Sequence, residues 1–323
     1  MKDKLLVIVG PTAVGKTALS IELAKRYHGE IISGDSMQVY KGMDIGTAKA
    51  TVEEQQGIPH HLIDIKNPTE PYSVADFQSA AMPFITTINN KKKVPILVGG
   101  TGLYVNAVIH QYELHKKQGD NDLRHKLEQL AVENGSMHVY KLLQEADPVS
   151  AKQIHPNNVR RVIRALELTK VTGIPFSEQQ KEEEMESPYD LVYLALTMDR
   201  DQLYERINKR VDLMMEQGLL EEVTRLYRQG IQNCQSVQAI GYKELYQYLD
   251  GEISLEAAID LLKKNSRHYA KRQLTWFRNK TDATWFDMSN GLNSHVFLEI
   301  CQFIEGNWPQ MAKYRDSQLE EES

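Results

Sequence analysis

Residues 10–17 read Gly-Pro-Thr-Ala-Val-Gly-Lys-Thr and directly follow the continuous apolar run Leu5–Val9. The segment fits the pattern G-x-x-x-x-G-K-[ST] of a phosphate-binding loop. Leu5–Val9 is predicted to be a strand buried on both faces, and Ala18–Tyr27 has helical spacing. Because a strand precedes the loop and a helix follows it, we expect backbone N–H groups and the helix N-terminus to bind a di- or triphosphate.

Particular loop residues have expected roles. Lys16 would neutralise terminal phosphate oxygens, and Thr17 would offer its hydroxyl to Mg²⁺. The alternative is a plain glycine turn with a surface lysine. The residues expected to hold phosphate are Gly10, Pro11, Thr12, Ala13, Val14, Gly15, Lys16 and Thr17.

Two further strands are expected in the first third of the chain. Glu30–Ser33 ends in Gly34-Asp35-Ser36, and Val94–Val98 ends in Gly99-Gly100-Thr101-Gly102 before a helix over Leu103–Ile109. Short strands joined by helices predict a parallel sheet with its ligands at the carboxyl ends of the strands. The three polar, glycine-bearing segments all lie at such ends.

The pattern becomes helical from about His115. We expect a fold of class α/β, with a P-loop parallel sheet core, an all-helical insertion domain and a helical C-terminal part. The core would comprise residues 1–115 and 187–313, the insertion 116–186, and an acidic tail 314–323. Lys181–Glu186 is interpreted as a solvated linker, and Leu191–Leu196 as one more buried strand. The other expected helices are Asp122–Asn134, Met137–Ala146, Val159–Val171, Arg200–Gln217, Leu219–Gln229, Lys243–Leu249 and Leu255–Trp276.

Composition excludes several classes of protein. Of 323 residues, 41% are hydrophobic and 25% are charged, which allows a real core and excludes a largely disordered chain. Two cysteines, Cys234 and Cys301, cannot form a disulfide framework or a four-cysteine zinc site, so we expect a reducing cytoplasm. Neither a secretory signal nor a run of 18 apolar residues is evident, so no membrane partner is expected. The net charge of −6 argues against non-specific coating of nucleic acid but allows a local basic patch.

Asp35 is the candidate general base. A nucleotide hydrolase usually places a Mg²⁺-binding aspartate at the end of an apolar strand, but Val94–Val98 ends without a carboxylate. Asp35 would instead face the phosphates and take a proton from an attacking acceptor group. Thr101 could donate to phosphate oxygens. Both residues could also be simple turn formers, and the adjacent His60 and His61 are interpreted as structural because a metal pair needs helical spacing.

Three basic segments stand out. Arg206 and Arg210 share one face of a helix and could clamp a diphosphate, or pair with Glu205 and other carboxylates. Arg160, Arg161 and Arg164 lie within little more than one helical turn. Residues 263–280 carry seven formal positive charges, interleaved aromatics and no acidic residue. This pattern is typical of RNA binding, although a solvated basic face is the alternative.

Together these motifs resemble the bacterial tRNA dimethylallyltransferase family. The resemblance rests on residues 10–17, Ser33–Tyr40, Met43–Lys49, Gly99–Tyr104 and Ile240–Tyr242, and extends to about residue 287. It implies transfer of a dimethylallyl group from its diphosphate to N6 of the adenosine 3′-adjacent to the anticodon. The loop would then bind diphosphate rather than ATP. Asp35 would take the N6 proton, Thr101, Lys16 and Arg210 would stabilise the leaving diphosphate, with Arg206 beside it, and Thr17 would help to hold Mg²⁺.

The resemblance also implies a set of contacts to the anticodon stem-loop of tRNA. These residues are Asp35, Ser36, Met37, Gln38, Thr101, Arg124, Arg160, Arg161, Val162, Ile163, Arg164, Gln238, Ala239, Ile240, Gly241, Tyr242 and Lys243. No His follows His295 and only Cys301 lies in that region, so the zinc finger of eukaryotic relatives is not expected. Three alternatives stay open: a P-loop small-molecule kinase, a prenyltransferase acting on free adenine nucleotides, and a non-catalytic RNA-binding protein. We expect a cytoplasmic monomer.

Overall fold

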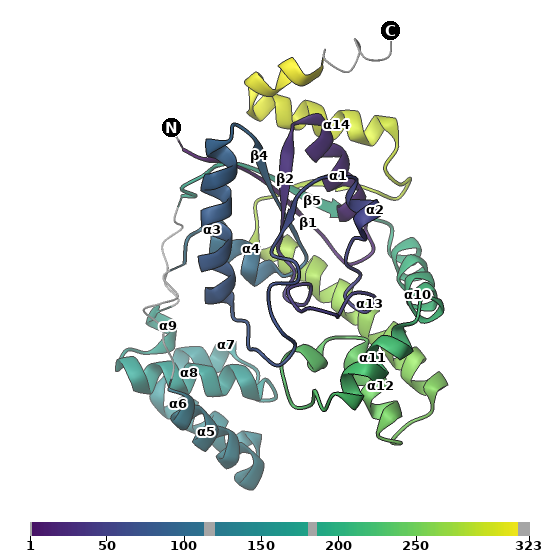
Figure 1. The fold of residues 1–323 in the computed structure, drawn as a ribbon. Helices are drawn as coiled ribbons and strands as arrows, with labels where there is room; N and C mark the ends of the chain where they lie inside the picture. The colour runs from purple at the N-terminus through teal and green to yellow at the C-terminus, as the bar shows by residue number, and fades with distance from the viewer. Residues whose placement is uncertain (1, 113–119, 180–185, 316–323) are drawn as a thin grey trace. The chain divides into compact units, whose positions relative to one another are not determined.

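The computed structural model describes residues 2–112, 120–179 and 186–315 (Figure 1). The chain forms two compact units, one of Met1–Gln111 with Ser187–Ser323 and one of Tyr112–Glu186. The second unit begins at residue 112, where the sequence suggested 116. Most of the expected linker, residues 181–185, and most of the expected acidic tail, residues 316–323, lie outside the described residues.

The sheet of the first unit is entirely parallel. In the described part of the chain its strands have the order β3-β2-β4-β1-β5-β6. They are β1 (Lys4–Val9), β2 (Gly29–Ser33), β3 (His60–His61), β4 (Val94–Gly99), β5 (Asp190–Thr197) and β6 (Thr284–Asp287). The expected α/β class with a parallel sheet is therefore confirmed. Two strands, β3 and β6, were not expected.

Helices cover both faces of the sheet, which explains why β1 is apolar throughout. One set of alternate β1 side chains packs toward α1 (Lys16–Arg26) and α14 (Ser294–Asn307). The other set packs toward α3 (Val74–Asn90) and α4 (Gly102–Ile109). Figure 1 shows α3 and α14 on opposite sides of the sheet.

Four more helices of this unit follow β5. They are α10 (Arg200–Glu216), α11 (Leu219–Arg228), α12 (Tyr242–Leu249) and α13 (Leu255–Lys280). Helix α13 packs against α10, α12 and α4. It extends four residues past the expected end at Trp276, and its N-terminus is capped by Ser254, whose side chain accepts from the N–H of Ala257. The remaining short elements are α2 (Val52–Gln55), η2 (Ser236–Gln238) and η3 (Pro309–Arg315).

The second unit consists, in its described residues, of helices alone. They are α5 (Asn121–Asn134), α6 (Ser136–Ala146), α7 (Pro148–Gln153), α8 (Val159–Thr172) and α9 (Phe176–Gln179). Their apolar faces meet around Leu127, Val139, Leu143, Val162 and Leu166, all nearly fully buried. In neither unit is a described helix long and apolar enough to cross a membrane.

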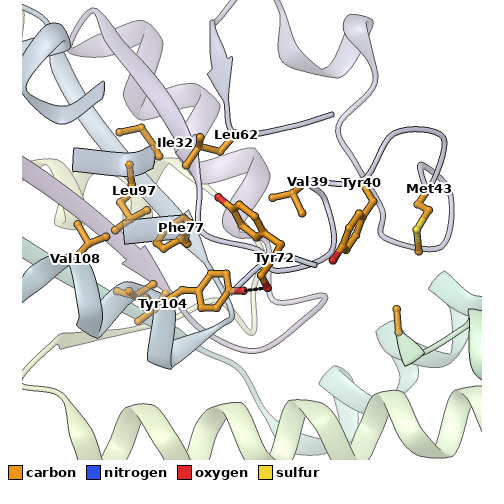
Figure 2. Packing of buried hydrophobic residues seen from close by; sticks show 14 of the residues in the cluster. Ile32, Val39, Tyr40, Met43, Leu62, Tyr72, Phe77, Leu97, Tyr104 and Val108 are labelled. Carbon is orange, nitrogen blue, oxygen red and sulfur yellow. Dashed lines mark hydrogen bonds between the residues drawn. The ribbon is translucent and has the colours of Figure 1, made fainter. Parts of the chain in front are cut away.

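The segment after β2 is held against the core of the first unit. Val39, Tyr40 and Met43 are each fully buried. Next to them, the Tyr104 hydroxyl donates to the Tyr72 carbonyl over 3.2 Å, and the rings of Phe77 and Tyr104 stack 4.8 Å apart (Figure 2). This packing fixes the course of the chain that leaves the strand end at Asp35.

The ends of β2 and β4 approach so closely that no side chain fits between them. A Cβ on Gly99 would stand 2.4 Å from the carbonyl oxygen of Gly34 and 2.7 Å from its carbon. Glycine at residue 99 therefore allows the loop carrying Thr101 to lie beside the loop carrying Asp35.

We expect Gly99→Ala to lower the free energy of unfolding by about 1–3 kcal/mol, because the added methyl group must push the two strand ends apart. Chemical denaturation measures this loss. Gly306→Ala is the control, since a Cβ there meets nothing within 4 Å, and it should change stability by no more than about 1 kcal/mol. Equal stability of the two variants would contradict the proposed crowding.

Candidate active site

A cavity of about 330 Å³ adjoins the loops that follow β1 and β2. Its charged lining residues include Asp35, Arg210 and Arg272, and its apolar lining includes Ile207 and Met214. All of its lining residues belong to the first unit. Charged groups next to an apolar wall suit a ligand that is anionic at one end and apolar at the other.

The phosphate loop has the backbone that its glycines allow. Gly10 and Gly15 have φ angles of 147° and 108°, and Ala13 also lies in the left-handed region at 65°. At Gly10 a Cβ would stand 2.7 Å from the Leu196 carbonyl oxygen, so a larger residue does not fit. Lys16 donates through Nζ to the carbonyls of Gly10 at 3.0 Å and Pro11 at 2.7 Å.

Lys16 stands in a site that disfavours its charge. Burial and the neighbouring Arg210 lower its pKa to about 7, although the Asp35 carboxylate opposes the shift. Burial also lowers the pKa of Arg210, while Asp35 raises it. Two desolvated cations therefore share one nearby carboxylate, an arrangement that favours an anionic ligand.

Asp35 uses one carboxylate oxygen for its own loop. Oδ1 accepts from the N–H groups of Met37 at 2.8 Å and Gln38 at 3.3 Å. Within the described chain, Oδ2 makes no hydrogen bond. The turn-forming alternative is thus correct for one oxygen, and the other is available to accept a proton.

Thr101 and Arg210 reach this region from other elements. Thr101 precedes α4, and its buried hydroxyl lies beside Tyr269 of α13. Burial and the Asp35 charge raise the pKa of Tyr269 to about 12. Arg206 is close enough to lower the pKa of Arg210, but it is exposed and does not line the cavity. Of the two expected clamp residues, only Arg210 faces the cavity.

The segment 44–46 is held by a buried carboxylate. Glu222 accepts from the backbone N–H groups of Asp44 at 2.8 Å, Ile45 at 2.9 Å and Gly46 at 3.1 Å, and from the Tyr242 hydroxyl at 2.6 Å. Tyr242 is fully buried. Its side chain supports the segment 44–46 through Glu222, and the expected contact of this residue with tRNA stays a prediction.

The neighbouring segment behaves differently. Gln238, Ala239, Ile240, Gly241 and Lys243 all line the cavity, as do Ser36 and Met37. The side chain of Gln38 instead accepts from the Ser33 hydroxyl at 2.9 Å and donates to the carbonyls of residues 47 and 48. The structure therefore places most of the expected contacts of the first unit around one cavity.

The arginines of the second unit divide into two groups. The fully buried carboxylate of Glu167 binds Arg124 at 2.8 Å and Arg164 at 2.9 Å. Arg160 and Arg161 are exposed and form no ion pair within the described residues. The side chains of Val162 and Ile163 belong to the apolar core of this unit, and the expected contact of these residues with tRNA stays a prediction.

Helix α13 supplies residues that sequence reasoning did not assign to the site. Tyr269 and Arg272 line the cavity, and Gln273 hydrogen-bonds to two of the loops. Two of the seven cations of this helix have partners on α10, since Lys263 pairs with Asp212 and Arg267 donates to Asn208. The aromatic residues between the cations of this helix were the signal in the sequence that could have pointed to these residues. They indicated that one face of the helix packs inward.

The two adjacent histidines have structural partners. His61 lies 2.8 Å from the buried carboxylate of Glu30, and His60 lies 2.8 Å from the Ile58 carbonyl. In the described parts of the chain, no cluster of three or more His, Cys, Asp or Glu side chains is arranged to hold a metal ion.

Known proteins match this chain over almost its whole length. A family model described as IPP transferase matches residues 38–280. A tRNA dimethylallyltransferase of Halalkalibacterium halodurans is 60% identical over 314 residues, which cover 97% of this chain and 100% of that protein.

Solved structures match as well. The crystal structure of the full-length tRNA isopentenylpyrophosphate transferase from Bacillus halodurans has a TM-score of 0.74 and 58% identity, and the match covers 98% of this chain and 100% of that one. A eukaryotic dimethylallyltransferase acting on tRNA has a TM-score of 0.77 and 34% identity, over 89% of this chain and 74% of that one.

The depressed pKa of Lys16 predicts a pH-dependent stability. The unfolded lysine binds its proton up to about 10.5, and the folded one up to about 7, so the unfolded state holds more protons between these values. Burying the charged Lys16 therefore destabilises the folded state by its full amount below pH 7. This destabilisation decreases as the pH rises, because the folded lysine loses its proton. We expect the free energy of unfolding, relative to that of Lys16→Met, to increase from pH 7 to pH 9. A constant difference in urea denaturation would contradict this.

Proposed function

Because the chain belongs to the IPP transferase family, we propose a mechanism for it as a tRNA dimethylallyltransferase, built on the cavity that joins the phosphate loop to Asp35. The observation that carries the mechanism is that Asp35 and Arg210 line one cavity with Thr12 of the phosphate loop. This arrangement supports a mechanism in which a base, cations and backbone donors act at a single reaction centre.

The reaction replaces one bond by another. N6 of the adenosine that follows the anticodon attacks C1 of dimethylallyl diphosphate, and the bond between C1 and the diphosphate oxygen breaks with its electron pair on oxygen. The acceptor nitrogen loses a proton to Asp35 Oδ2. The diphosphate gains negative charge as it leaves, and the loop N–H groups, Lys16, Thr101 and Arg210 stabilise that charge.

Asp35 fits the role of base because its two oxygens are used differently. Oδ1 is held by the backbone of residues 37 and 38, which orients the carboxylate. Oδ2 can then accept a proton without any rearrangement of the loop.

We also propose that Thr17 would help to hold Mg²⁺ beside the diphosphate. Mg²⁺ in phosphate sites takes most of its ligands from phosphate oxygens and water, so few protein groups are required. The exposed Thr17 at the start of α1 fits this requirement, since its hydroxyl can serve beside the phosphates. When bound, the ion would neutralise part of the charge of the leaving group.

For tRNA we propose two contact regions, argued for each unit by itself. In the first unit, the cavity that would receive the base is lined by Ser36, Met37, Gln238, Ala239, Ile240, Gly241 and Lys243. In the second unit, exposed Arg160 and Arg161 are suited to phosphates of the anticodon stem. That the enzyme acts as a cytoplasmic monomer stays a prediction.

A kinase or an enzyme for free adenine nucleotides would give different products. Incubation with radiolabelled dimethylallyl diphosphate and unmodified tRNA should label N6 of the adenosine next to the anticodon. Labelling of AMP but not tRNA would support the free-nucleotide alternative. Micromolar ATP binding without affinity for dimethylallyl diphosphate would support a kinase.

We expect Asp35→Asn to lower the single-turnover rate by about 10²–10⁴, the usual effect of removing a positioned base. Asparagine keeps an oxygen for the turn, so tRNA affinity should stay within about threefold, as for interactions that are not part of the chemical step. Asp44→Asn is the matched control, because Asp44 pairs with Lys49 instead of facing the cavity. A near-normal rate in Asp35→Asn would rule out the base.

Changing Arg160 and Arg161 together to Gln should weaken tRNA binding and flatten its salt dependence, by a slope of about 0.7–0.9 for each phosphate group that is no longer bound. Binding of dimethylallyl diphosphate should be unchanged. The control changes exposed Lys152 and Lys170 to Gln, which removes the same charge elsewhere on this unit. Normal tRNA affinity of the arginine variant at every salt concentration would exclude these two arginines as tRNA contacts.

A further inference from the structure

One face of α13 contacts the phosphate loop and the loop that follows β4. Tyr269, Gln273 and Trp276 are spaced at i, i+4 and i+7, so they share this face. Tyr269 lines the cavity beside Thr101. Trp276 packs so tightly on Gly102 that a Cβ there would stand 2.1 Å from its indole nitrogen.

Gln273 lies between these aromatics and hydrogen-bonds to two loops at once. Its Oε1 accepts from the N–H of Thr12 at 2.9 Å, and its Nε2 donates to the carbonyl of Gly100 at 3.0 Å. The first partner belongs to the phosphate loop and the second directly precedes Thr101. The side chain is 5% exposed, so water competes little for either bond.

At Gly100, the loop that precedes Thr101 has room for the Gln273 amide but not for a side chain of its own. A Cβ on Gly100 would stand 2.1 Å from Gln273 Nε2. The absence of a side chain at residue 100 therefore lets α13 reach the backbone of both loops. A buried amide with one acceptor and one donor matches the N–H of one loop and the carbonyl of the other.

We propose that Gln273 is a positioning residue, which sets the distance between the phosphate loop and Thr101 and so places the donors for the leaving diphosphate. It acts through Thr12 and Thr101 and does not itself touch substrate. The inference rests on the proposed function, because it concerns the geometry of the diphosphate site. Small displacements of such donors reduce the rate of the chemical step more than they reduce tRNA binding.

Two substitutions of similar size separate hydrogen bonding from packing. Gln273→Met fills the space but makes neither bond. Gln273→Glu keeps an acceptor for the Thr12 N–H, but its carboxylate repels the Gly100 carbonyl. Once protonated, the introduced carboxyl group has both a carbonyl oxygen and an O–H donor, so it can make both bonds again. Burial raises the pKa of such a carboxyl group toward the working range.

The test is the single-turnover rate at saturating tRNA and dimethylallyl diphosphate, measured from pH 6 to pH 8.5 for each variant relative to the unmodified protein. At pH 8 we expect the single-turnover rate of both variants to be about ten- to hundredfold lower than that of the unmodified protein, with tRNA affinity unchanged. At pH 6 the relative rate of Gln273→Glu should rise by about fivefold or more, because the protonated carboxyl group gains an O–H donor. The relative rate of Gln273→Met should not rise.

Gln78→Met is the matched control. Gln78 is equally buried, and its Nε2 donates to the Ala107 carbonyl at 2.7 Å, away from the cavity. This variant should lose thermal stability but keep its rate. A near-normal rate for Gln273→Met, or parallel pH profiles of the two Gln273 variants, would overturn the proposal.

If Gln273→Met does not fold, the pH profile of Gln273→Glu against the unmodified protein decides alone. Its recovery at low pH supports the proposal, and a constant ratio overturns it. Failure of the unmodified protein to prenylate tRNA would instead count against the proposed function, so the two failures are distinguishable.

Discussion

The carbonyl of Gly34 lies directly against the Cα of Gly99, where even a methyl group would stand 2.4 Å from the oxygen. Strand β4 separates β2 from β1, so the loop after β2 could not otherwise approach the phosphate loop. Two glycines at the end of β4 remove the side chains that would intervene. Asp35, the hydroxyl of Thr101 and the phosphate loop come together because of this close backbone contact.

The same closeness creates the electrostatics of the site. Lys16 and Arg210 are desolvated together, and Asp35 is the carboxylate that acts on both of them. A bound diphosphate would add negative charge next to these two groups, which would raise the pKa of Lys16 again and favour its charged form. In the proposed mechanism, these preorganised groups would stabilise the negative charge that grows on the leaving diphosphate.

Local patterns predicted the phosphate loop and many of the long elements, because an apolar run or a 3.6-residue period needs no information from elsewhere in the chain. The long helices α3 and α14 were not among the expected elements. Strands β3 and β6 have two and four residues, too few to show a period, and pairing with a neighbour alone makes them strands. Local patterns also did not show that Val162, Ile163 and Tyr242 are buried. These residues stand among the expected tRNA contacts, and their side chains fill the interior of the protein.

The sequence by itself determined the α/β class with a parallel sheet, because apolar runs and helical periods are visible along the chain. It also predicted the phosphate loop and proposed Asp35 as base, each from a short contiguous segment. The tertiary structure decided which arginines are held in ion pairs, because the buried Glu167 binds Arg124 from one helix and Arg164 from another. It also decided that Gln273 meets Thr12, a residue 261 positions earlier in the chain. Such contacts depend on how whole helices pack. Packing between distant segments produces no periodic pattern in the sequence, so the sequence alone does not reveal them.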